Sequence, residues 1–168
     1  MDINAFAEKL ETYRSAFWNA SASTDFAVSP ELLAGLAICE SSLDQYAIRV
    51  ERGFWKRYKA GIMRFVNRSE SKRDNFWAKY PDIYASSYGL CQIMVQTALE
   101  AGWTMKRFPT ELFDPEENVT LAAKILAKHV RRYGLEKALL RYNGGGDPSY
   151  PSRVLDAANA VRSLGLWR

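Results

Sequence analysis

The sequence predicts an α+β fold that is predominantly α-helical, with a small β-hairpin as its extended part. The first observation is that apolar residues recur at helical spacing along most of the 168 residues. The second is that Ser-Pro-Glu and Asp-Pro-Glu triplets, which are typical of helix starts, precede two of these segments. Only residues 86–94, SSYGLCQIM, are typical of extended chain, with Gly89 at a bend. No internal repeat, linker or low-complexity tract interrupts the pattern, so we expect residues 1–168 to form a single domain.

The first two helices are predicted from their capping residues. Behind a possible cap at Asp2, apolar side chains recur at helical spacing (Ile3, Phe6, Leu10, Tyr13 and Phe17). A second helix begins at Ser29-Pro30-Glu31, which combines a capping residue, a proline at the first helical position and an acid in the first turn. It is expected to end at Ser41-Ser42.

Three further helices are predicted in the C-terminal half. Asp114-Pro115-Glu116 repeats the capping arrangement, and Gly134 is placed to end the helix that follows it. The apolar residues within 135–142 predict a short helix there. Pro151 begins a last helix, which is expected to end near Gly165.

The composition is that of a globular domain, and its charge does not select a partner. The net charge is +4, and a basic surface favours any polyanion, such as nucleic acid, an acidic cell wall or a membrane surface. Residues 50–85 mix aromatic with basic side chains, which would suit nucleic-acid contact. Their aromatic and apolar residues also keep helical spacing, so a helix with a buried aromatic face explains the segment at least as well (Phe54, Tyr58, Ile62 and Phe65). We therefore expect no nucleic-acid partner.

The sequence carries no recognisable export signal or membrane span. Residues 1–20 lack a basic segment followed by an apolar run, so we expect synthesis in the cytoplasm without a signal peptide. No stretch approaches the roughly 20 apolar residues that a membrane span needs. In such a chain, Cys39 and Cys91 are expected to be buried, reduced thiols rather than a disulfide. With His129 as the one histidine, we expect neither a zinc site nor another cofactor.

Glu40 stands on the apolar face of its predicted helix. Leu33, Leu36 and Ala37 precede it by seven, four and three residues, so a helix places all four side chains on one side. Burial raises the pKa of a carboxyl group, and the C-terminal end of a helix disfavours an anion. Glu40 is thus predicted to stay protonated near neutral pH, as a general acid for glycosidic cleavage must be. The alternative is a glutamate that turns outward at a frayed helix end.

Three short segments, the first of which begins at Glu40, resemble motifs of the soluble-type lytic transglycosylases, whose catalytic domain is related to goose-type lysozyme. Glu40-Ser41-Ser42 resembles the first motif of that family, and residues 89–94, GLCQIM, resemble the second with cysteine in place of a methionine. Residues 138–144, ALLRYNG, resemble the third, and residues 118–126 fit the helix between them. The resemblance covers about residues 30–145, with an insert at about 50–85, and implies a lysozyme-like fold. Residues 46–58 and 141–154 also resemble a subgroup found in bacteriophages and prophages.

The resemblance implies that the chain cleaves the glycan strands of peptidoglycan. Glu40 would protonate the oxygen between N-acetylmuramic acid and N-acetylglucosamine, and Tyr142 would orient its carboxyl group by a hydrogen bond. Gln92 and Asn143 would contact N-acetyl groups, and Met94 would line a sugar subsite.

Ser41 would either bind substrate or cap its helix. The resemblance also implies an endolysin, released by a phage holin, or a lysin delivered with virion proteins. In either case it would act on the cell wall.

A hydrolase of this kind would need a second carboxylate, for which Asp44, Glu51 and Asp82 are the candidates. Asp44 would otherwise face solvent, and Glu51 would pair with Arg49 or Arg52. None of the candidates falls at a clear counterpart of the goose-type aspartates, so we expect an intramolecular reaction that yields a 1,6-anhydro product. The alternatives are a hydrolytic muramidase of the same fold and a glycan-binding virion module without activity.

Overall fold

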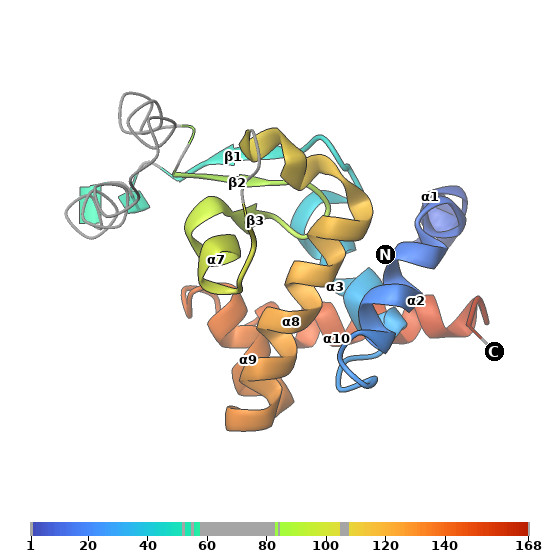
Figure 1. Cartoon of the computed structure of the whole chain (residues 1–168). Coiled ribbons are helices and arrows are strands. Elements are labelled where there is room, and N and C mark those ends of the chain that lie inside the picture. Colours follow the sequence, from blue (N-terminus) through green and yellow to red (C-terminus); the bar gives the residue numbers. More distant parts are fainter. Residues whose placement is uncertain are drawn as a thin grey trace.

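The computed structural model describes residues 2–51, 53–54, 56–57, 83, 85–104 and 108–167, in which a small antiparallel sheet lies at one side of a body of packed helices (Figure 1). The prediction of a predominantly helical α+β fold is confirmed. Asp82 and most of the aromatic stripe predicted for residues 50–85 lie outside the described residues. The helices are η1 (Ile3–Phe6), α1 (Ala7–Thr12), α2 (Arg14–Ala22), α3 (Pro30–Ser41), α7 (Val95–Glu100), η2 (Pro109–Phe113), α8 (Pro115–Tyr133), α9 (Leu135–Tyr142) and α10 (Tyr150–Ser163). The strands are β1 (Ile48–Val50), β2 (Ser86–Tyr88) and β3 (Ile93–Met94).

The helix starts lie where the capping residues predicted them. The Ser29 side chain accepts a hydrogen bond from the backbone N–H of Leu32 at the start of α3, and Asp114 does the same for Glu117 at the start of α8. Gly134, at φ 77°, ends α8. The apolar repeat of residues 3–17 does not form one helix, because it divides into η1, α1 and α2. Spacings of three and four residues fit 3₁₀ and α geometry alike, so the sequence pattern did not reveal these breaks.

Helix α3 is buried along most of its length and packs against α10. Leu33, Leu36 and Ala37 are fully buried, as their shared face predicts. The two helices cross closely at Gly35, where an added Cβ atom would lie 2.6 Å from the backbone nitrogen of Ala158. This close approach brings the C-terminal end of α3 beside the N-terminal end of α10.

The predicted hairpin is confirmed, but it belongs to a sheet with a third strand. The strand order is β1-β2-β3, and both pairs are antiparallel. Ile48 pairs with Tyr88, and Tyr88 pairs with Ile93. The expectation that residues 86–94 are the only extended chain is therefore wrong. The sequence of β1 is Ile-Arg-Val, and this alternation spans only three residues, fewer than the four to eight by which a strand is recognised in sequence.

The turn between β2 and β3 is anchored by Asn118 of α8, which is fully buried. Its Oδ1 accepts the backbone N–H of Cys91 at 2.8 Å, and its Nδ2 donates to the carbonyls of Tyr88 at 2.9 Å and Leu112 at 2.8 Å. Gly89 begins this turn at φ 73°, and an added Cβ there would lie 2.5 Å from the Leu112 carbonyl oxygen. Backbone conformation and space both require glycine at this position.

Candidate active site

A cleft of about 770 Å³ lies among the sheet, α8 and the C-terminal ends of α3 and α9. Most of the residues that the sequence predicts for a site line this cleft (Glu40, Glu51, Gln92, Met94, Tyr142 and Asn143). Ser41 and Asp44 are not among its lining residues. The fold therefore gathers residues from all three resembling segments around one hollow.

Glu40 is the buried acid of this cleft. Its side chain is 6% exposed, and it occupies the last turn of α3, which ends at Ser42 in a left-handed conformation. Burial raises the pKa of the Glu40 carboxyl above its ordinary value, against the opposing effects of a Tyr150 hydrogen bond and of Arg49. The direction of this shift agrees with the predicted one, and it moves Glu40 toward the protonated form that a general acid needs.

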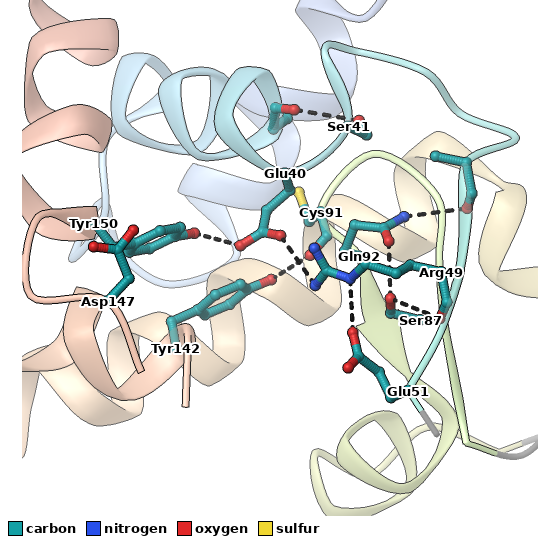
Figure 2. Close-up of polar contacts among 12 residues, drawn as sticks. Glu40, Ser41, Arg49, Glu51, Ser87, Cys91, Gln92, Tyr142, Asp147 and Tyr150 are labelled. Carbon is teal, nitrogen blue, oxygen red and sulfur yellow. Dashed lines mark hydrogen bonds and ion pairs between the residues drawn. The ribbon is translucent and has the colours of Figure 1, made fainter. Parts of the chain in front are cut away.

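The tyrosine that holds Glu40 is Tyr150, at the start of α10. Its hydroxyl donates to Oε1 of Glu40 at 2.5 Å (Figure 2). Tyr150 is 2% exposed, and burial together with the Glu40 charge raises the pKa of its hydroxyl well above the ordinary value. The hydroxyl therefore keeps its proton and donates it toward the carboxyl group, which leaves Oε2 to face the cleft.

Tyr142 makes a different hydrogen bond from the predicted one. Its hydroxyl donates to the backbone carbonyl of Cys91 at 2.8 Å, so it ties α9 to the turn that follows β2 (Figure 2). The expectation that Tyr142 bonds to the Glu40 carboxyl is thus wrong for this structure, because Tyr150 occupies that role. One signal in the sequence points to Tyr150: it directly precedes Pro151, and so has a fixed place in the first turn of α10.

The other oxygen of Glu40 faces Arg49 of β1. Nη2 of Arg49 lies 3.9 Å from Oε2 of Glu40, and Nε of Arg49 donates to Glu51 at 2.6 Å. Glu51 thus holds the guanidinium group beside the acid, in agreement with the alternative that it pairs with Arg49 (Figure 2). Asp44, the other described candidate for a second carboxylate, is exposed and accepts the backbone N–H of Tyr46.

Ser41 and Gln92 bond to the protein itself. The Ser41 hydroxyl donates to the Leu90 carbonyl at 2.8 Å and accepts the backbone N–H of Asp44, so it joins the end of α3 to the hairpin turn. Nε2 of Gln92 donates to the carbonyls of Ala47 and Gly89. Both amide hydrogens of Gln92 are engaged in this way, so the donors predicted for N-acetyl groups are not free.

Oε1 of Gln92 accepts the Ser87 hydroxyl at 2.8 Å. The Asn143 side chain lines the cleft and, within the described part of the chain, makes no hydrogen bond to another residue. Met94 lines the same wall, where it is partly buried.

Both cysteines are free thiols. Cys91 is buried, and burial raises the pKa of its thiol, while Cys39 is partly exposed rather than buried as expected. Among the residues that the structure describes, no group of three or more histidine, cysteine, aspartate and glutamate side chains could hold a metal ion.

We expect Tyr150→Phe to lower kcat about tenfold and to move the alkaline limb of the pH profile to higher pH. The hydroxyl favours the charged form of Glu40, so its removal raises the pKa of that carboxyl and keeps it protonated to higher pH. A hydrogen bond to a charged group contributes about 1.5–3 kcal/mol, which is enough to misplace the acid when it is lost. Rates measured between pH 4 and 9 check both effects.

Tyr142→Phe is the matched control for this substitution. Its hydroxyl bonds to a backbone carbonyl and not to the carboxyl group, so activity should fall while the alkaline limb keeps its position. If the alkaline limb of the pH–rate profile moves with Tyr142→Phe but not with Tyr150→Phe, the orienting role belongs to Tyr142.

Comparison with known proteins adds one match. A family model described as "Transglycosylase SLT domain" matches residues 17–151, an interval that includes Glu40, Arg49 and Tyr150. No curated protein and no solved structure matches the chain significantly.

Proposed function

The chain belongs to the transglycosylase SLT domain family, and from this premise we propose that it is a peptidoglycan lytic transglycosylase. It cleaves the β-1,4 bond between N-acetylmuramic acid and N-acetylglucosamine and forms 1,6-anhydro-N-acetylmuramic acid. The observation that carries the proposal is the buried Glu40, with Tyr150 on one carboxyl oxygen and the cleft on the other.

In the first step, Glu40 gives the proton on Oε2 to the glycosidic oxygen. The bond between this oxygen and muramyl C1 breaks, and the leaving N-acetylglucosamine keeps the proton as a hydroxyl group. Positive charge develops at C1 while Glu40 becomes a carboxylate. Arg49, 3.9 Å from Oε2, stabilises this carboxylate, and the Tyr150 hydroxyl holds its other oxygen in place.

In the second step, the C6 hydroxyl of the same muramyl residue attacks C1. The new C6–O–C1 bond closes the anhydro ring, and the hydroxyl proton returns to Oε2 of Glu40. No water is consumed, and the acid is ready for another cycle. One carboxyl group serves both steps because the nucleophile belongs to the bound sugar, where effective concentrations of about 10⁵ M or more are reached.

The surroundings of the other acids support this route over hydrolysis. A water nucleophile needs a second carboxylate on the opposite face of the sugar ring. Of the carboxylates that the structure describes, only Glu51 lines the cleft together with Glu40, and it is paired with Arg49. Asp44 lies outside the cleft lining.

Mass spectrometry of the muropeptides released from purified sacculi tests the proposal. We expect products that end in 1,6-anhydro-N-acetylmuramic acid, lighter by one water than the products of a muramidase and without new reducing ends. Predominantly reducing-end products would identify a hydrolytic muramidase and return Glu51 to the position of second carboxylate. Binding to sacculi without any released product would identify a glycan-binding module instead.

We further propose that the enzyme serves a bacteriophage, as an endolysin or as a virion-associated lysin. The support is the resemblance of residues 46–58 and 141–154 to the phage subgroup. In the described part of the chain, no helix has both the length and the apolar character of a membrane span. Cells that produce the protein in the cytoplasm should stay intact until a holin or chloroform opens the inner membrane. Lysis without either agent would contradict this delivery route.

A further inference from the structure

The chain enters α10, which begins at Tyr150, through a run of three glycines at positions 144–146. Gly144 and Gly145 adopt φ values of 73° and 79°, and an added Cβ at either position would meet no atom within 4 Å. No side chain of this run can pack against the protein to fix where the helix begins. The residues that follow the glycines make the contacts that define the first turn of α10.

Asp147 joins the two ends of this turn. Its Oδ1 accepts the backbone N–H of Ser149 at 2.9 Å and the Ser149 hydroxyl at 2.7 Å, and its carbonyl accepts the backbone N–H of Tyr150 at 3.1 Å. Its Oδ2 accepts Nη2 of Arg153 at 2.6 Å. The hydrogen bonds from Ser149 lower the pKa of the Asp147 carboxyl below its ordinary value, so Asp147 is an anion near neutral pH.

Arg153 lies over the ring of Tyr150. It follows Tyr150 by three residues, so the helix places the two side chains on one side. The guanidinium carbon of Arg153 is 5.8 Å from the centroid of the Tyr150 ring, within the range of a cation–π contact. Asp147 thus holds the guanidinium group beside the ring whose hydroxyl donates to Glu40 (Figure 2).

Neither Asp147 nor Arg153 is among the residues that line the catalytic cleft. We propose that both are positioning residues, which keep the Tyr150 hydroxyl on the Glu40 carboxyl group by fixing the first turn of α10. The inference rests on the proposed function and adds two residues to its machinery, each of which acts through Tyr150 and not on the sugar.

The groups around Glu40 give this proposal a distinctive sign. The Tyr150 hydrogen bond, Arg49 and Arg153 lower the pKa of the Glu40 carboxyl, whereas Glu51 raises it. Three groups that are neutral near pH 7 also face it (Cys39, Cys91 and Tyr142).

An effect of charge alone would differ between the two proposed residues. Arg153→Gln removes a cation and would raise the pKa of Glu40, while Asp147→Asn removes an anion and would lower it. Loss of the Tyr150 hydrogen bond raises the pKa in both variants. Asp147→Asn therefore separates positioning from a direct effect of charge.

The first test measures rates on purified sacculi between pH 4 and 9. We expect Asp147→Asn and Arg153→Gln each to lower kcat about threefold with little change in KM, as for the loss of an exposed ion pair. Both should move the alkaline limb of the pH–rate profile to higher pH, because Glu40 then stays protonated longer. An alkaline limb that stays in place or moves to lower pH with Asp147→Asn would overturn the proposal.

Glu11→Gln is the matched control. It removes a carboxylate from another exposed ion pair, that of Glu11 with Arg14 at 3.3 Å, and neither residue lines the cleft. We expect kcat and the alkaline limb to keep their wild-type values. If Glu11→Gln moves the limb as far as Asp147→Asn does, the limb follows the overall surface charge and the proposal fails.

A double-substitution cycle tests whether Asp147 acts through Tyr150. In the Tyr150→Phe protein the hydroxyl that Asp147 would position is already absent. Adding Asp147→Asn to Tyr150→Phe should therefore lower kcat no further. The same threefold loss in both backgrounds would show that Asp147 acts independently of the tyrosine and would contradict the inference.

A measurement without turnover keeps the inference separate from the proposed activity. The pKa of Glu40 is followed by ¹³C NMR of labelled glutamate carboxyl groups, with Glu40→Gln to assign the signal. We expect a higher pKa in the Asp147→Asn protein than in the wild-type protein, whether or not the chain cleaves peptidoglycan. An equal or lower pKa would overturn the inference even if the predicted anhydro products are found.

Discussion

Glu40→Gln should abolish the clearing of peptidoglycan and leave the fold intact. Glutamine keeps the shape of the side chain and can still accept the Tyr150 hydrogen bond, but it carries no proton for the glycosidic oxygen. A positioned general acid contributes about 10²–10⁴-fold in rate, and here the same group also accepts the C6 hydroxyl proton. Turbidity loss of purified sacculi and release of muropeptides measure the effect.

The stability of the Glu40→Gln protein provides an internal check. Since burial raises the pKa of Glu40 in the folded protein, its ionisation opposes folding at pH values above the ordinary carboxyl range. The neutral amide removes this cost, so the variant should have a Tm at or above that of the wild-type protein at pH 7–8. At about pH 4, where the unfolded carboxyl is also largely protonated, the difference should disappear.

Glu51→Gln is the matched control for activity. It removes the charge of the other described carboxylate in the cleft and releases Arg49, but it leaves the proton donor in place. We expect a moderate loss of activity and the same anhydro products. Near-wild-type clearing by Glu40→Gln, or complete inactivation by Glu51→Gln alone, would remove Glu40 from its role as the single acid.

Asn118→Ala should lower the free energy of unfolding by about 3 kcal/mol. The substitution deletes three buried hydrogen bonds, and a buried group that loses its partner costs about 1–3 kcal/mol before relaxation. The hairpin turn that carries Cys91 and Gln92 would lose its anchor to α8. Urea denaturation followed by circular dichroism measures the change.

Asn159→Ala is the control for this experiment. Asn159 is an exposed asparagine of α10, and its side chain bonds to Arg162 at the surface. A surface substitution of this kind is expected to stay within about 0.5 kcal/mol. If Asn118→Ala also stays below about 1 kcal/mol, the turn is held by its glycine and its strand pairing alone.

The sequence by itself determined the features that depend on residues close together in the chain. Caps at Ser29 and Asp114 and the stop at Gly134 work through atoms a few residues away, so their positions were predicted correctly. Burial of Glu40 followed from the apolar spacing before it, because a helix fixes which side chains share a face. The hairpin at residues 86–94 was predicted for a similar reason, from a glycine at a bend between apolar positions.

Only the tertiary structure decided which partners surround the acid. Tyr150 is 110 residues from Glu40 in the chain, and Arg49 comes from a strand of three residues, which is too short to be recognised in the sequence. A tyrosine can reach the carboxyl group only where two helices approach closely, and it is Gly35 that lets α10 approach α3. The local sequence around Tyr142 and Tyr150 does not contain that crossing, so the prediction named Tyr142 where the fold places Tyr150 on the carboxyl group. Side-chain partners across a core depend on how whole elements pack, and this packing is a property of the folded chain.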